Sequence, residues 1–130
     1  MNVYINKKNL HLILSAIILI PASLLYGLYP EEALPRLFEV DIASVDLRNI
    51  FRAIMFLYLG IAGILVLGVL TSDYWKFATL LLIVFMGSLA LGRVISYFID
   101  GKPSLLFILG LFGELILAVF SYRQLRHFKA

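Results

Sequence analysis

Four long apolar runs limit what this chain can fold into more than any other feature of its sequence. They cover about residues 10–28, 47–70, 77–99 and 104–122, and each is close to the roughly 20 residues that an α-helix needs to cross a bilayer. Hydrophobic residues make up 62% of the chain and charged residues 15%, whereas soluble domains are about half apolar and about a quarter charged. We therefore expect one integral membrane domain, residues 1–130, folded as an all-α, four-span antiparallel transmembrane helix bundle with a long first outer loop.

The composition also limits the chemistry that the chain can perform. It has no cysteine, which excludes disulfides, thiolate metal ligands and thiol redox reactions. His11 and His127 have no acidic neighbours at ligand spacing, so we predict no metal site. No serine has a candidate histidine partner on the outer side, and no basic stripe typical of nucleic-acid binding occurs. The sequence thus points to no catalytic residue, no cofactor and no nucleic-acid partner.

Basic residues are divided unequally between the two sides of the predicted bundle. One side has six of them against a single acid, Asp73, and the other has three against six acids. The six are Lys7, Lys8, Lys76, Arg123, Arg126 and Lys129. Because an excess of Lys and Arg marks the cytoplasmic side, we predict that both termini are cytoplasmic. The first run is long for a secretory signal and ends without a small-x-small cleavage site, which favours a retained anchor.

The long first connection reads YPEEALPRLFEVDIASVD. Pro30 is typical of the first position of a helix, and the two glutamates that follow it suit the first turn. Three apolar residues then share one helical face, which predicts a short helix lying on the outer membrane surface; these are Leu34, Leu37 and Phe38. Asp46 stands where the second span begins, and we predict that it is the N-cap of that helix.

Three charged residues lie inside the predicted spans. At about 1.5 Å per residue, Arg52 lies roughly 7 to 8 Å and Arg93 roughly 10 Å below the outer surface, and Glu114 lies roughly 15 Å deep. All three belong to the outer half of the bundle, where long side chains from neighbouring helices can meet. The predicted ligand-binding residues are Arg48, Asn49, Arg52, Arg93 and Glu114, surrounded by Ser96, Tyr97, Asp100 and Tyr58.

Each such charge costs about 2.5 to 3.5 kcal/mol at a helix centre, so the three should be paired or hydrated inside the bundle. Two arginines against one glutamate leave a positive charge over, which suits an anionic lipid or a small anion. Alternatively, Asp46 or Asp100 completes a purely structural network, or the charges form a proton or ion path. Pairs of small residues are expected where helices approach closely, namely Gly60 with Gly63, Ser88 with Gly92, and Gly110 with Gly113.

Three functions are compatible with such charges. The first is a protein that binds or passes a lipid-like or anionic molecule. The second is an accessory or assembly subunit that packs against other membrane subunits. The third is a membrane enzyme acting on a lipid, with Glu114 as its acid or base.

Several segments carry a family resemblance. They read DLRNIFRAIMFLYLG, FMGSLALGRVIS and DGKPS, followed by the segment around Glu114. Together they resemble a bacterial family known as domain of unknown function 4345, and the resemblance covers nearly the whole chain. It implies a small four-helix integral membrane protein and supplies no reaction or cofactor. We expect the protein in the bacterial inner membrane, with both termini cytoplasmic. Four-helix bundles of the DoxX type are a more distant comparison, which implies at most a link to membrane redox complexes.

Overall fold

The computed structural model describes residues 6–128 and contains five α-helices and no strand within them. The helices are α1 (Leu10–Gly27), α2 (Pro30–Leu37), α3 (Val45–Leu70), α4 (Ser72–Asp100) and α5 (Leu105–Phe128). All except the short α2 are long and apolar enough to cross a membrane. The all-α fold, with four helices of membrane-spanning length and a long first connection, is therefore confirmed. Lys129, one of the predicted cytoplasmic basic residues, lies outside the described residues.

The spanning helices extend beyond the apolar runs that predict them. α4 begins at Ser72 rather than near residue 77, and α5 continues to Phe128 rather than ending near residue 122. Apolar runs mark only the part of a helix that suits lipid, whereas the backbone hydrogen bonds continue through polar residues. The predicted loop after α3 consequently shrinks to Thr71 alone.

The predicted N-cap of the second span is wrong. Ser44 caps α3, because its Oγ accepts a hydrogen bond from the backbone N–H of Leu47 at 3.1 Å. Asp46 lies one residue inside the helix, in its first turn, where a negative charge still interacts favourably with the helix dipole.

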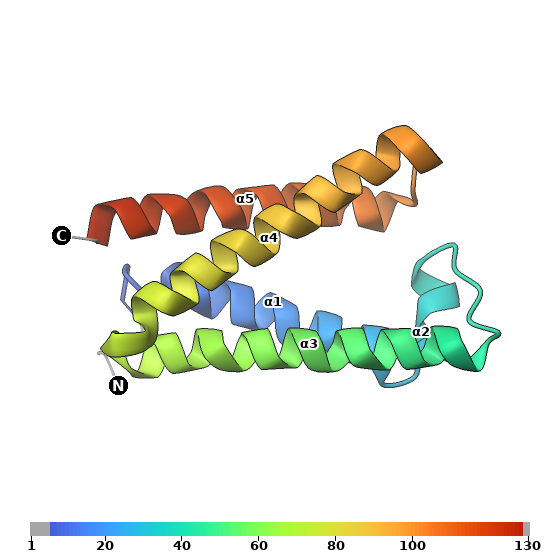
Figure 1. Cartoon of the computed structure of the whole chain (residues 1–130), viewed down its shortest axis with the longest axis horizontal. Helices are drawn as coiled ribbons and strands as arrows, with labels where there is room; N and C mark the ends of the chain where they lie inside the picture. The colour runs from blue at the N-terminus through green and yellow to red at the C-terminus, as the bar shows by residue number, and fades with distance from the viewer. Residues whose placement is uncertain (1–5, 129–130) are drawn as a thin grey trace.

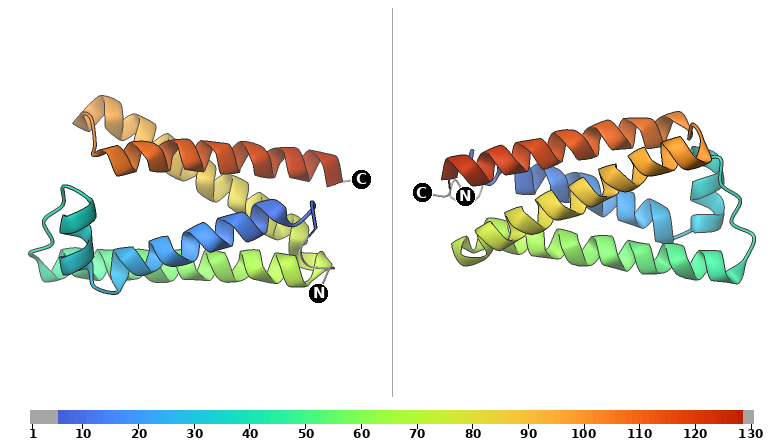
Figure 2. Two further views of the ribbon diagram at one scale, coloured as in Figure 1. Left: turned by 180° about the vertical axis from the view of Figure 1, so that it is seen from behind. Right: turned by 45° about the horizontal axis from the view of Figure 1, so that its top comes forward.

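The four long helices are arranged as two pairs. α1 packs along α3 and α4 packs along α5, while α3 and α4 contact each other next to their short connection. Both chain ends lie at that end of the bundle, which we call the termini end (Figure 1). The pairs diverge toward the opposite end, the loop end, where α2 lies (Figures 1 and 2). The result is a bundle that is closed at the termini end and splayed at the loop end.

Two glycines permit the closest helix contacts. A Cβ atom built on Gly27 of α1 would collide with Met55 of α3, and one built on Gly68 would lie 2.5 Å from the Cβ of Ala78 on α4. The predicted close-packing glycines are different and are wrong for this bundle. A Cβ built on Gly60, Gly63, Gly92 or Gly113 would have no atom within 4 Å, and one on Gly110 would only reach ordinary contact distance from Arg93.

Buried polar side chains help to close the termini end. His11 of α1 is fully buried, and its Nε2 lies 2.9 Å from Oγ1 of Thr79 on α4. The Thr79 hydroxyl donates to the backbone oxygen of Trp75 at 2.8 Å, and the Trp75 indole N–H donates to the backbone oxygen of Lys8 at 3.2 Å. These bonds connect the start of α1 to the start of α4 within the core.

The short helix α2 forms as predicted, beginning at Pro30 with two glutamates in its first turn. Its apolar face differs from the prediction, because it turns toward the protein rather than toward a membrane surface. Leu34 is only 1% exposed, and the Phe38 ring stacks on Phe107 of α5 with centroids 4.3 Å apart. Leu37 does remain exposed. The segment thus covers part of the gap between the diverging helix pairs.

Candidate functional site

An ion pair between α4 and α5 forms the centre of the candidate site. Arg93 Nε donates to both carboxylate oxygens of Glu114, each at 2.9 Å. The Arg93 side chain is 23% exposed and that of Glu114 is 11% exposed. Among residues 6–128 no other ion pair lies within 4 Å. The structure therefore brings together the two charges that the sequence places deepest in the predicted spans.

The turn between α4 and α5 makes this pairing possible. Gly101 ends α4 with a φ of +103°, in a region that side chains disfavour, and Pro103 follows directly. The tight turn lays α5 back along α4, so a residue seven positions before Asp100 can meet one ten positions after Ser104.

Arg52 does not join this cluster. Arg52 is exposed, and its Nη1 donates to the backbone oxygens of Gly27 at 2.8 Å and Leu28 at 3.2 Å. These are carbonyls at the end of α1 that have no partner within the helix. Arg52 therefore caps α1, and the predicted surplus of positive charge beside Glu114 is wrong.

Of the other predicted residues, only Tyr58 lies beside the ion pair. Tyr58 is 8% exposed and lines the same cavity as Arg93 and Glu114. Ser96 instead donates to Asp100 at 2.7 Å on the exposed end of α4, so Asp100 does not neutralise Arg93. The remaining predicted residues line no part of this cavity; these are Arg48, Asn49, Arg52, Tyr97 and Asp100.

Aromatic side chains that sequence reasoning missed surround the ion pair. The Arg93 guanidinium carbon lies 5.1 Å from the centroid of the Phe107 ring, which is a cation–π contact. Tyr26 of α1 meets Tyr58 edge to face at 5.7 Å and stacks near Phe38 at 6.3 Å. The sequence signal that could have identified Tyr26 is its seven-residue spacing from Leu19, a buried residue on the same face of α1.

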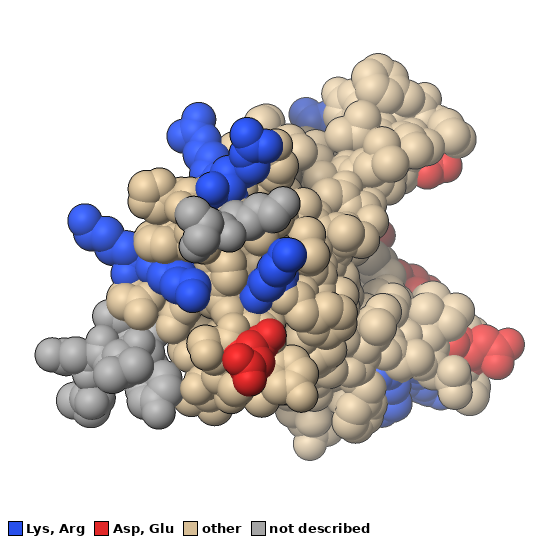
Figure 3. All heavy atoms as spheres, turned by 60° about the vertical axis from the view of Figure 1, so that its left-hand side comes forward, with Lys and Arg blue, Asp and Glu red and all other residues tan. Residues whose placement is uncertain are grey.

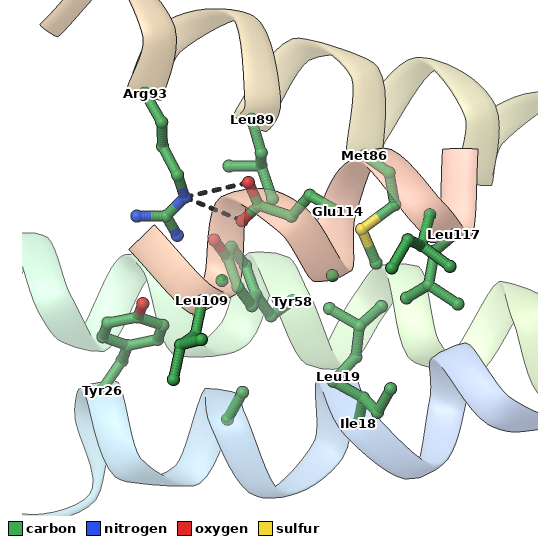
Figure 4. Close-up of a pocket in the computed structure, with 14 residues that line it drawn as sticks. Ile18, Leu19, Tyr26, Tyr58, Met86, Leu89, Arg93, Leu109, Glu114 and Leu117 are labelled. Carbon is green, nitrogen blue, oxygen red and sulfur yellow. Dashed lines mark hydrogen bonds and ion pairs between the residues drawn. The ribbon is translucent and has the colours of Figure 1, made fainter. Parts of the chain in front are cut away.

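A cavity of about 400 Å³, which we call the central cavity, adjoins the pair (Figure 4). Its walls come from α1, α3, α4 and α5, and are apolar apart from Tyr26, Tyr58, Arg93 and Glu114. Ile18 and Ile116 line it and yet are more than half exposed. The central cavity therefore opens to the outer surface of the bundle between α1 and α5.

A second cavity of about 440 Å³, the outer cavity, lies between α4 and the start of α5. Arg93 and Leu89 line both cavities, so the guanidinium stands at their boundary. The outer cavity includes Ser96 and Tyr97, two residues predicted to surround the site, together with Gly92 and Phe107.

The chemistry of the site follows from this geometry. Arg93 uses its Nε for Glu114, and Figure 4 shows the two terminal nitrogens turned away from the carboxylate. The pair is neutral as a unit but retains N–H donors at the edge of an apolar cavity. Within the described residues, no group of three or more His, Cys, Asp or Glu side chains is placed to hold a metal ion.

Comparison with known proteins identifies the family. The profile described as a domain of unknown function, DUF4345, matches residues 8–123. The chain therefore belongs to the DUF4345 family, as the resemblance of its charged and small-residue segments indicated. No match was found among curated proteins or among solved structures.

Proposed function

We propose that this member of the DUF4345 family is an integral protein of the bacterial inner membrane that binds a lipid-like ligand in the central cavity. The head of the ligand accepts hydrogen bonds from Arg93, and its apolar part lies between α1 and α5. The observation that carries the proposal is a cavity with apolar walls, an opening onto an apolar surface, and one polar end. Ligand sites combine apolar walls with a few orienting polar groups in this way.

The proposed orientation places both termini in the cytoplasm. Basic side chains gather on the termini end of the molecule, with one acidic side chain among them (Figure 3). The described residues that the sequence assigns to this side are Lys7, Lys8, Lys76, Arg123 and Arg126, with Asp73 as the acid. Such an excess supports a cytoplasmic position.

The neutral ion pair narrows the class of ligand that the central cavity suits. Without Arg52 beside it, Arg93 has no surplus charge to offer, so the site needs a hydrogen-bond acceptor and not a full counter-charge. An uncharged acceptor on an apolar chain, such as an ester or amide carbonyl, meets this need. A small free anion suits the site less, because mostly apolar walls would not replace its hydration shell.

A matched pair of glycine substitutions tests the proposal. Gly113 lines the central cavity and Gly60 does not, and a Cβ at either position meets no atom within 4 Å. Gly113→Leu should fill the cavity, whereas Gly60→Leu adds the same side chain elsewhere. We expect native mass spectrometry after gentle extraction to show one small-molecule adduct mass on the wild type and Gly60→Leu that is missing from Gly113→Leu. Retention of every adduct mass by folded Gly113→Leu, or the absence of adducts from all three proteins, would refute the proposal.

A second candidate is an accessory subunit in which the charges are purely structural. It is favoured by Gly60 and Gly63, which leave open space on the outward side of α3 where a partner helix can approach closely. It predicts that other polypeptides co-purify with the chain and are lost in Gly60→Leu. The third candidate, an enzyme with Glu114 as acid or base, has less support because Arg93 Nε already engages both carboxylate oxygens.

A further inference from the structure

A pocket at the termini end combines charged and aromatic side chains from two distant parts of the chain. This basic pocket has a volume of about 650 Å³. Gln124 of α5 donates to the backbone oxygen of Lys7 at 3.1 Å, which joins the N-terminal segment to the end of α5. The lining residues are Lys7, Phe120, Tyr122, Arg123, Gln124, Arg126, His127 and Phe128. Three of them are permanently basic and none is acidic.

An apolar groove continues from the basic pocket along α5. This α5 groove, of about 380 Å³, is lined by Leu115, Ile116, Val119, Phe120 and Arg123. It shares Phe120 and Arg123 with the basic pocket. At its other end Ile116 also lines the central cavity. Charge therefore gives way to apolar surface in one direction along the helix.

We infer that an anionic phospholipid occupies these two features, with its phosphate at Lys7, Arg123 and Arg126 and one acyl chain in the α5 groove. Arginine and lysine beside a phosphate supply charge-assisted hydrogen bonds, and basic pockets on membrane proteins bind anionic lipid heads. The phosphate alone fits the basic pocket, but the adjoining apolar groove selects a phosphate that carries a hydrocarbon chain.

The dimensions agree with this occupant. Leu115 and Arg123, at the two ends of the α5 groove, are eight residues apart, which corresponds to about 12 Å along a helix. That is a little less than half of the roughly 30 Å hydrocarbon thickness of a bilayer, so the groove fits within one leaflet. This inference does not depend on the proposed ligand at Arg93, because its polar contacts are at the opposite end of α5.

The test compares two charge-matched double variants of the full chain. Arg123→Gln/Arg126→Gln neutralises the basic pocket, and Lys76→Gln/Lys102→Gln removes the same charge from residues that line neither feature. Binding of phosphatidylglycerol is measured by native mass spectrometry, against phosphatidylcholine with the same acyl chains. We expect the pocket variant to lose about tenfold or more of its phosphatidylglycerol affinity, and the control variant to keep wild-type affinity.

Further measurements separate the remaining outcomes. Equal loss in both double variants, or equal affinity for the two lipids, would overturn the inference by showing a response to total charge or to acyl chains alone. Displacement of the lipid by millimolar inorganic phosphate would overturn the role of the groove. Far-ultraviolet circular dichroism checks that each variant is folded. Gly113→Leu should retain phosphatidylglycerol binding, so failure here and failure of the proposed function are distinguishable.

Discussion

The termini end and the loop end of the bundle are held together by different forces. At the termini end the helices touch through small residues such as Gly68 and Ala78, and the polar atoms of Thr79 and Trp75 bond within the core. At the loop end the helix pairs diverge: the ion pair holds α4 to α5 within one pair, and the stacked rings of Phe38 and Phe107 bridge the gap between the pairs. The difference shows that Arg93 and Glu114 lie where packing is incomplete, beside the central cavity.

The largest effect is expected from breaking the ion pair. Arg93→Met would leave Glu114 without its partner in a mostly apolar site, which should lower the free energy of unfolding by about 3 kcal/mol. The double variant Arg93→Met/Glu114→Leu removes both charges and should recover most of that loss. Denaturation with sodium dodecyl sulfate in mixed micelles measures each value. If the double variant is stable yet has no ligand adduct, the pair serves binding; a stable double variant that keeps the adduct would argue that the pair serves structure alone.

A packing change at the termini end should have the next largest effect. Gly68→Ala places a Cβ 2.5 Å from that of Ala78, and such overpacking should cost about 2 kcal/mol. Gly63→Ala is the control, since its Cβ meets no atom within 4 Å. The same micelle titration compares the two variants. Similar stability of both would contradict the close contact between α3 and α4.

The smallest effect is expected where α2 meets α5. Phe38→Ala removes the ring stacked on Phe107, which should cost about 1 kcal/mol. Phe56→Ala, on an outward-facing ring that is 68% exposed, should change stability less in a lipid-like micelle. Limited proteolysis gives an independent measurement, because the segment around α2 should be cut faster in Phe38→Ala only. Equal cleavage of the two variants would show that the stacked rings do not hold α2 in place.

The contrast between the two ends also explains what the sequence could predict. Apolar run length reflects bilayer thickness, so the four spans emerge without knowledge of packing. Depth along the helices also predicts the meeting of Arg93 with Glu114. Depth says nothing about which side of a helix a residue occupies, and Arg52 accordingly reaches the end of α1 instead. The sequence also does not show which side of α3 faces α4, and for this reason it did not predict that Gly68, and not Gly63, is the site of close contact.

The aromatic surroundings of the site were out of reach for a related reason. Phe38 lies beyond the end of α2, and its partner Phe107 is almost seventy residues away in the sequence. Only the path of the connecting segment across the gap brings the two rings together, and no periodicity encodes that path. Residues on regular helices, such as Tyr26, do carry a detectable spacing; residues on connections do not.

The single residue between α3 and α4 restricts how the bundle can move. Thr71 alone separates the two helices. Because a one-residue connection cannot lengthen, a rotation of the pair α1/α3 relative to the pair α4/α5 would have its pivot at Thr71. Such a rotation would displace the helices most at the loop end and least at the termini end. Such a motion would therefore widen the opening of the central cavity between α1 and α5 more than it would change the basic pocket.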